Sequence, residues 1–157
     1  MTEFQAALLS AQLTRLEEQT LTREKNAAYL NDRLSQVEGL SVQPNDERIT
    51  RRAYHLYCLR IEPAVFGCTR ERFSEAVKAE GLPIGPGYLL PLYKQPCFRA
   101  LDGGPDYDLV HCPVTEDLCA TSGAWAVHQV LLGSEQDMAE FAAIIEKVKG
   151  QAGALRG

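Results

Sequence analysis

The 157 residues, 45% of them hydrophobic and 24% charged, are typical of a single soluble globular domain whose core needs no metal or disulfide. A net charge of −5 argues against nucleic acid or an anionic membrane surface as a partner, and the chain has no run of about 18 apolar residues that could cross a membrane. Five cysteines without a C-x-x-C pair, and no leader-like N-terminus, predict a cytoplasmic protein with reduced thiols.

The N-terminal segment, residues 3 to about 36, contains neither proline nor glycine, and its apolar residues recur at three- and four-residue steps. This pattern predicts one long helix, or two nearly continuous ones, ended by Gly39. At about 1.5 Å per residue the helix would span roughly 45–50 Å, which is more than a compact domain of this size needs. We therefore expect it to extend beyond its own domain.

The next elements predict a small sheet with a covering helix. Residues 41–51 are polar and predict a loop or an edge strand, whereas Ala53–Ile61 is rich in aromatic and apolar residues and predicts a buried strand. Thr69 is a suitable N-cap for a helix that runs to Glu80, and a glycine follows it.

The segment Gly81–Phe98 (GLPIGPGYLLPLYKQPCF) carries three aromatic residues among four prolines and three glycines. Proline lacks an amide hydrogen and clashes with the preceding turn, so this segment cannot form a regular helix. It predicts a shaped connection, which continues to about residue 110 through a turn at 102–106. Ordered connections of this kind often carry function.

The C-terminal third predicts a short helix from Thr115, a short strand over Trp125–His128 and a last helix capped by Ser134. The tail, residues 151–157, is expected to fray. The order of elements predicts an α+β fold with a small antiparallel sheet covered by helices and preceded by the long N-terminal helix.

His128 is the strongest single candidate for a site, because it ends a short strand and strand ends point side chains into clefts. A structural role for His128 stays open as the alternative. Tyr88 and Tyr93 either line a pocket or satisfy buried backbone groups. His55, placed within the predicted strand, is interpreted as a buried structural histidine.

No complete catalytic set can be assembled from these residues. His111, Cys112 and Cys119 lack a fourth ligand and match no zinc pattern, so no metal is expected. All five cysteines are interpreted as core residues. None of the five lysines has the small, apolar surroundings that favour a Schiff base, and the chain has no glycine-rich phosphate loop.

Several segments in order resemble the C-terminal part of the DegT/DnrJ/StrS family of pyridoxal-phosphate-dependent sugar aminotransferases, a fold type I family. The resemblance covers nearly the whole chain. The segments that carry it are Met1–Ala7 with Ala11–Leu13, Arg23 with Asn26–Leu30, Tyr54–Tyr57, Arg70 and Phe73 with Glu80–Pro83, Gly87–Phe98, Cys112–Glu116, Trp125 with His128, Leu132–Gly133, and Asp137–Met138.

The resemblance implies a division of labour. In this family a large domain carries pyridoxal phosphate on a Schiff-base lysine, and a small C-terminal domain closes over the substrate. We expect residues 1–38 to form the helix that bridges the two domains, 39–150 the small domain and 151–157 a tail. Met1 follows the place where the family carries an Asn-x-Arg motif, so it is expected to be internal to a longer protein.

The expected function is therefore that of the C-terminal portion of an aminotransferase for a keto-sugar or a keto-cyclitol, with scyllo-inosose-type substrates the most similar. Tyr88 and His128 are the expected substrate rim, with Tyr93 behind them. The chain alone is expected to be inactive and to hold no covalent cofactor. The intact enzyme is expected to use an amino-acid donor and to form a homodimer.

Two other hypotheses remain open at this point. The chain is either a free-standing binding or regulatory module, which could pair with a separately encoded large domain, or an independent enzyme that uses His128 and a cysteine. No nucleophile, base and orienting group can be combined for the last of these.

Overall fold

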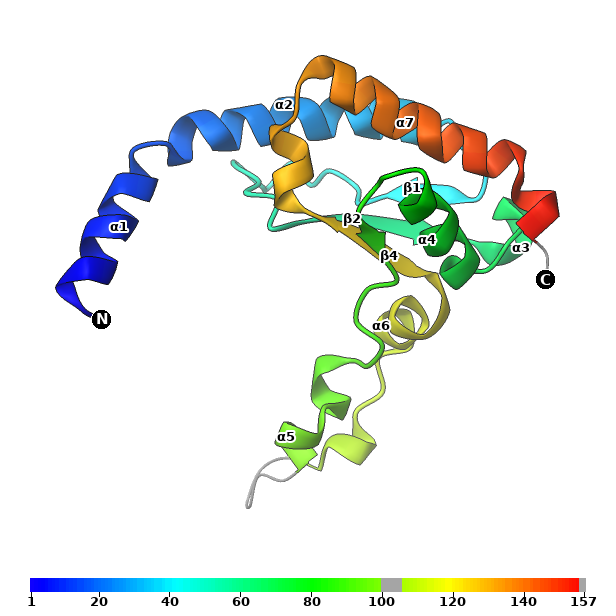
Figure 1. Ribbon diagram of the computed structural model, residues 1–157. Coiled ribbons are helices and arrows are strands. Elements are labelled where there is room, and N and C mark those ends of the chain that lie inside the picture. Colours follow the sequence, from blue (N-terminus) through cyan, green and yellow to red (C-terminus); the bar gives the residue numbers. More distant parts are fainter. Residues whose placement is uncertain (100–105, 156–157) are drawn as a thin grey trace.

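The computed structural model describes residues 1–99 and 106–155 (Figure 1). Its helices are α1 (Glu3–Leu13), α2 (Leu16–Leu34), α3 (Pro63–Phe66), α4 (Arg70–Ala79), α5 (Pro96–Arg99), α6 (Pro113–Asp117) and α7 (Glu135–Gly150). Its strands are β1 (Leu40–Val42), β2 (Leu56–Ile61), β3 (Ile84–Gly85) and β4 (Gly123–Val127).

The four strands form one antiparallel sheet in the order β1-β2-β4-β3, which confirms the predicted α+β class. The register pairs Leu56 with Val127 and Arg60 with Gly123, so β4 ends beside the start of β2. This pairing brings the residues just before β2 close to those just after β4, and the candidate site is built there.

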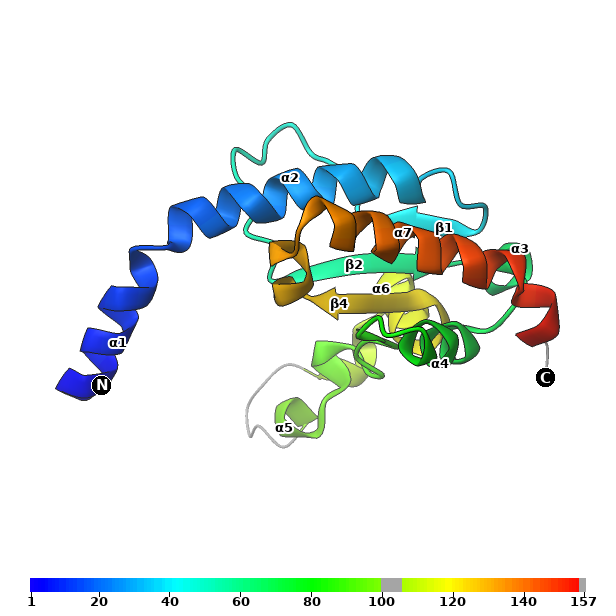
Figure 2. The same ribbon diagram turned by 45° about the horizontal axis from the view of Figure 1, so that its top comes forward.

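Helices α2 and α7 lie side by side over one face of the sheet (Figures 1 and 2). Both present a buried stripe at three- and four-residue steps, as an amphipathic helix must. The buried stripe of α7 is Met138, Phe141, Ala142, Ile145 and Val148. The stripe of α2 is less apolar, because Thr20, Arg23 and Asn26 share it with Ala27, Leu30 and Leu34.

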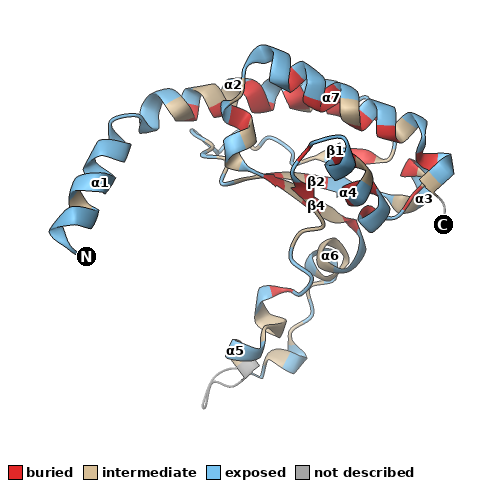
Figure 3. Ribbon diagram, in the orientation of Figure 1, coloured by how far each residue is buried: buried red, intermediate tan, exposed pale blue. Residues whose placement is uncertain are grey.

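The predicted N-terminal helix is realised as two helices that break at Thr14 and Arg15. α1 projects away from the body and buries no residue (Figures 1 and 3). The helical segment ends at Leu34 rather than at Gly39, so that expectation was wrong. Gly39 instead has a φ of +80° in the turn before β1, where a Cβ would lie 2.3 Å from the backbone nitrogen of Phe66.

Most other predicted elements are confirmed with shifted ends. Thr69 caps α4 and Ser134 caps α7 as expected, while α6 begins at Pro113 and β2 at Leu56. The tail differs from the expectation as far as residue 155: a 3₁₀ turn covers Ala152–Leu155, and Ala152 is buried against the core.

The proline-rich connection contributes β3 and then a lobe, defined here as residues 86–99 and 106–117. The lobe projects from the sheet on the side away from α2 and α7 (Figure 1). It contains a 3₁₀ turn at Leu92–Lys94, α5 and α6. The predicted turn at 102–106 lies outside the described residues, apart from Asp106.

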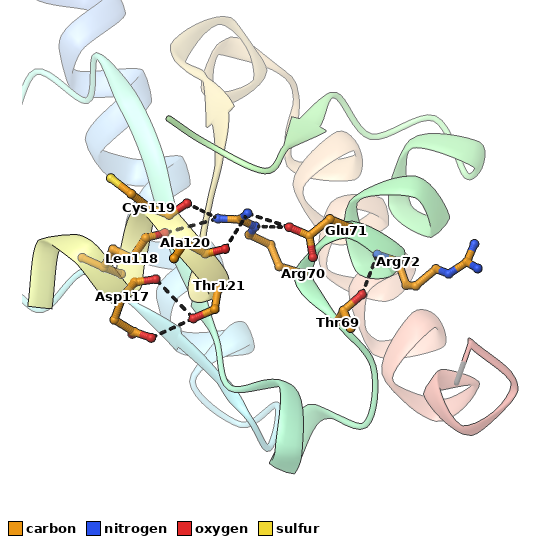
Figure 4. Close-up of polar contacts among 9 residues, drawn as sticks. All are labelled: Thr69, Arg70, Glu71, Arg72, Asp117, Leu118, Cys119, Ala120 and Thr121. Atoms are coloured by element: carbon orange, nitrogen blue, oxygen red, sulfur yellow. Dashed lines mark hydrogen bonds and ion pairs between the residues drawn. The ribbon is translucent and has the colours of Figure 1, made fainter. Parts of the chain in front are cut away.

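A buried arginine joins α4 to the turn that follows the lobe (Figure 4). The Arg70 side chain is 2% exposed, and its guanidinium donates to the carbonyl oxygens of Leu118, Cys119 and Ala120 at 3.3, 2.8 and 3.1 Å. These carbonyls belong to the π-helical turn Leu118–Ser122 that continues α6. Arg70 therefore supplies donors to three backbone carbonyls of this irregular turn, of which that of Leu118 also accepts from the Gly123 backbone N–H.

Within the described residues, no helix is long and apolar enough to cross a membrane. The same part of the chain contains no group of three or more His, Cys, Asp and Glu side chains placed to hold a metal ion.

Candidate functional site

A groove of about 460 Å³ lies where α1 and the first turns of α2 face the ends of the two central strands. We call it the α1–α2 groove. Nine residues line it: Leu9, Gln12, Leu13, Leu16, Gln19, Arg23, Ala53, His55 and His128. Three of the nine are leucines on the two helices, and the polar groups come from both helices and from the strand ends.

His128 lies in this groove, half-buried, at the start of the 3₁₀ turn His128–Leu132 that follows β4. The imidazole of His55 stacks on it, with ring centroids 6.1 Å apart and an interplanar angle of 26°. The antiparallel register explains the pairing, because Leu56 faces Val127 and each histidine is the next residue outward.

His55 is therefore not the buried mid-strand histidine that the sequence predicted. It is exposed and precedes β2. The physical reason is the backbone at Tyr54, which has a φ of +50°, a left-handed conformation that is uncommon for residues other than glycine. This turn delays the strand by several residues and leaves His55 at its open end.

Arg23 lines the same groove and is the functional candidate that the sequence reasoning missed. It is 6% exposed, and its Nε has no hydrogen-bond partner among the described residues. One terminal nitrogen of its guanidinium donates to the Thr20 hydroxyl at 3.2 Å. A sequence signal was available, since Arg23 occupies the buried stripe of α2 at regular helical spacing from Thr20 and Ala27.

A buried amide one turn after Arg23 on α2 joins this helix to the turn that begins with His128. Asn26 donates from Nδ2 to the carbonyl oxygens of Leu131 and Gly133, both at 2.9 Å. These two bonds fasten the turn that begins with His128 to the helix that carries Arg23. The side of the groove that carries Arg23, His55 and His128 is thus built on α2, β2 and β4, whereas α1 supplies the opposite side.

The two tyrosines that the sequence singled out lie elsewhere. Tyr88 is 64% exposed, and its ring meets Trp125 edge-on at a centroid distance of 4.5 Å. The Tyr93 hydroxyl donates to Glu116 at 2.5 Å inside the lobe. Neither tyrosine is among the residues described as lining the α1–α2 groove.

The hydrogen-bonded pair of Tyr93 and Glu116 in the lobe has strongly shifted pKa values. The hydrogen bond from Tyr93, with the nearby Lys94 ammonium, lowers the pKa of Glu116 to about 2. Burial and the Glu116 carboxylate together raise the pKa of Tyr93 to about 12. The Tyr93 hydroxyl therefore remains a donor over the whole physiological range, and its role within this chain is to hold α6 to the Leu92–Lys94 turn.

The profile of the DegT/DnrJ/EryC1/StrS aminotransferase family matches residues 1–147. The chain belongs to this family. One relative of the chain is an L-glutamine:2-deoxy-scyllo-inosose aminotransferase from Streptomyces fradiae. The two sequences are 38% identical over 94% of this chain and 37% of the relative. A 3-amino-5-hydroxybenzoate synthase from Amycolatopsis mediterranei is 32% identical over 92% of this chain and 37% of its own length.

Solved structures of family members agree with the fold. A crystal structure of 3-amino-5-hydroxybenzoic acid synthase superposes with a TM-score of 0.78 at 29% identity, over 93% of this chain and 38% of that one. A family aminotransferase from Brucella abortus gives a TM-score of 0.68 at 26% identity, over 93% and 35% of the two chains. The chain thus spans about two fifths of the length of the curated relatives it matches.

The family generally depends on pyridoxal phosphate, and the lysines of this chain do not fit its covalent attachment. The ammonium groups of Lys25, Lys94 and Lys147 each pair with a carboxylate. Lys149 donates to two backbone carbonyls, and Lys78 is exposed. No lysine of the chain lies in the desolvated apolar site that a Schiff base needs.

Proposed function

We propose that this chain is the C-terminal, substrate-enclosing portion of a pyridoxal-phosphate-dependent aminotransferase that acts on a keto-cyclitol or keto-sugar in amino-sugar biosynthesis. The family match over residues 1–147 carries this proposal. The names of the relatives support the substrate class, because several are L-glutamine:scyllo-inosose-type aminotransferases. The chain alone is inactive in this proposal, since the cofactor lysine belongs to the part of the relatives that it does not span.

His128 is the residue of this chain that we assign to the substrate site. It lines the α1–α2 groove together with Arg23 and the stacked imidazole of His55. Tyr88 and Tyr93, both in the lobe, complete the proposed rim of the substrate site. Tyr93 lies behind Tyr88 in this proposal, because its hydroxyl already donates to Glu116. They would meet the substrate from a second direction, or from a second subunit of the proposed homodimer.

The proposed partner of α1 is the cofactor-bearing large domain. α1 buries no residue in this chain (Figure 3). It exposes several large apolar side chains. These are Phe4, Leu8, Leu9 and Leu13, each at least half exposed. Such a patch is unusual on a protein that acts alone and is typical of an interface. We propose that residues 1–38 bridge the two domains and that the whole enzyme is cytoplasmic.

The same surface bears on the alternative, a free-standing binding or regulatory module. A module that acts alone should be monodisperse in solution. A chain whose α1 face normally lies against another domain should self-associate through that face. Light scattering on the full chain, with Leu8→Lys and Leu9→Lys as variants that replace two of the exposed apolar side chains of α1, separates the two cases.

The proposal is tested by sequencing the DNA directly upstream of the Met1 codon. We expect an in-frame coding stretch longer than this chain, with a lysine in the cofactor-binding context of the family. A stop codon followed by a ribosome-binding site would overturn the single-chain proposal. The protein would then be a separate subunit or module.

A further inference from the structure

The buried guanidinium of Arg23 has no counter-ion among the residues that the structure describes. Its only described hydrogen bond goes to the neutral Thr20 hydroxyl, and its Nε has no partner among the described residues. Burying a charge without a partner is costly, and natural proteins rarely leave one so. An anion that binds at this position would remove the penalty.

Two of the three carboxylates nearest in sequence, those of Glu17 and Glu24, are engaged by other groups. Glu17 accepts from both terminal nitrogens of Arg51, at 2.8 and 2.9 Å. Glu24 accepts from the backbone nitrogen of Arg52 at 3.0 Å and lies 3.8 Å from the Arg51 guanidinium. The third, Glu18, is exposed, and no ion pair joins Arg23 to a carboxylate among the described residues.

The lining of the α1–α2 groove is suited to an anion. No carboxylate stands among its nine described residues, which include one guanidinium, two imidazoles and the amides of Gln12 and Gln19. The amide oxygen of Gln12 accepts from Arg15 at 2.8 Å, which leaves its amide hydrogens available as donors. Thr20 accepts from Arg23 and itself donates to the Leu16 carbonyl at 2.7 Å, so the guanidinium is held in one orientation.

We propose that the α1–α2 groove binds the carboxylate of the amino-acid donor, with Arg23 as its principal ligand. This inference rests on the proposed function and adds to it the place where one of the two substrates, the amino donor, binds. Of the two substrates that the relatives' names give, 2-deoxy-scyllo-inosose is an uncharged polyol ketone and L-glutamine carries a carboxylate. A buried guanidinium discriminates in favour of the charged one.

Two further features agree with an amino acid. The groove volume of about 460 Å³ is within the range of small-molecule pockets, and its aliphatic wall accommodates a short side chain. No carboxylate of the described lining is placed to bind an ammonium group. The amine of the donor is therefore left free to react, as an amino-group transfer requires.

The test is an NMR titration of the full 157-residue chain with L-glutamine, in which the imidazole resonances of His55 and His128 report on the groove. The uncharged analogue L-glutaminol, with a hydroxymethyl group in place of the carboxylate, is the matched probe. We expect L-glutamine to shift both imidazoles in a saturable way and L-glutaminol to bind at least about tenfold more weakly. Equal binding of the two probes would overturn the proposal.

Arg23→Gln should weaken L-glutamine binding at least about tenfold, because a charge-assisted hydrogen bond is lost. Arg33→Gln is the matched control, since Arg33 lies on the same helix, outside the groove, in an ion pair with Glu146. Unchanged binding by a folded Arg23→Gln chain contradicts the assignment. If that variant does not fold, Gln19→Leu replaces it, with a smaller expected loss; unchanged affinity there also counts against the proposal.

Inorganic phosphate is titrated in parallel to identify the anion. Phosphate that binds more tightly than L-glutamine would make the groove a phosphate site and refute the carboxylate assignment. The readout involves no turnover, so its failure is distinct from a failure of the proposed function. Aminotransferase activity without a glutamine-dependent shift would refute only the present inference.

Discussion

Replacing Arg70 by Met is expected to destabilise the fold far more than the same change at its neighbour Arg72. Arg70 is 2% exposed and donates to three backbone carbonyls of the turn after α6 (Figure 4). It also donates to Glu71 at 2.9 and 2.6 Å. Methionine retains most of the apolar stem, so the variant removes chiefly the hydrogen bonds.

The hydrogen bonds from Arg70 to the three carbonyl oxygens account for most of the expected loss of stability. The Glu71 side chain is 54% exposed, and a half-exposed ion pair contributes only about 0–1 kcal/mol. Removing the buried partner of a hydrogen-bonded charge network costs about 3–5 kcal/mol. The turn that carries the three carbonyls borders solvent, and water replaces part of the lost bonding. We therefore expect a loss of about 3 kcal/mol in the free energy of unfolding.

Urea unfolding of the full chain, followed by circular dichroism, measures this loss. The control is Arg72→Met on the same helix, where the exposed guanidinium pairs with Glu75 at 3.1 Å. It should cost at most about 0.5 kcal/mol. The reasoning is refuted if Arg70→Met costs no more than Arg72→Met, because the carbonyl contacts would then contribute nothing measurable.

Three further predictions concern a turn, the lobe and the groove. Gly39→Ala should lower the free energy of unfolding by more than about 3 kcal/mol, because it combines left-handed backbone strain with a 2.3 Å clash. Gly81→Ala, at a φ of +100° with open space around it, should lower it by about 1 kcal/mol in the same urea titration. The pKa of Glu116 is lowered from 4.5 to about 2, so the stability that Glu116 contributes is present above pH 4.5 and is lost as the pH falls to about 2. Tyr93→Phe should make the free energy of unfolding less dependent on pH in this range. In the intact enzyme, His128→Ala should reduce turnover or substrate affinity more than it reduces stability, as seen by steady-state kinetics beside thermal unfolding.

Each of these has an outcome that counts against it. If Gly39→Ala and Gly81→Ala lower the free energy of unfolding equally, the turn at Gly39 must move away from Phe66 and relieve the clash. An acid slope unchanged by Tyr93→Phe would mean that Lys94 alone sustains the shifted pKa. Kinetics of His128→Ala no different from those of His111→Ala, an exposed lobe histidine, would remove His128 from the site.

The sequence predicted the helices and the sheet well, because local signals specify them. Thr69 and Ser134 are capping residues that accept from the backbone in the first helical turn, as their positions predicted. The α7 stripe appears in the apolar spacing. Element ends were predicted less well, and the tail least, because the burial of Ala152 depends on a tertiary contact that no local pattern records.

The groove could not be assembled from the sequence for a specific reason. His55 and His128 are far apart in the chain and meet only through the β2–β4 register and the left-handed turn at Tyr54. A bulky residue in that conformation has no sequence signature. Arg23 was visible as a charge on a buried helical stripe, but only the structure shows that its Nε lacks a partner.

The central claim is most directly tested by amino transfer in the protein that includes the coding region upstream of Met1. The protein is incubated with L-glutamine labelled with ¹⁵N at the α-amino group and with 2-deoxy-scyllo-inosose or a nucleotide-linked keto-sugar, and the products are analysed by mass spectrometry. The account predicts an amine product that carries the label, from one of these ketones. A protein with bound cofactor that aminates none of them would contradict it.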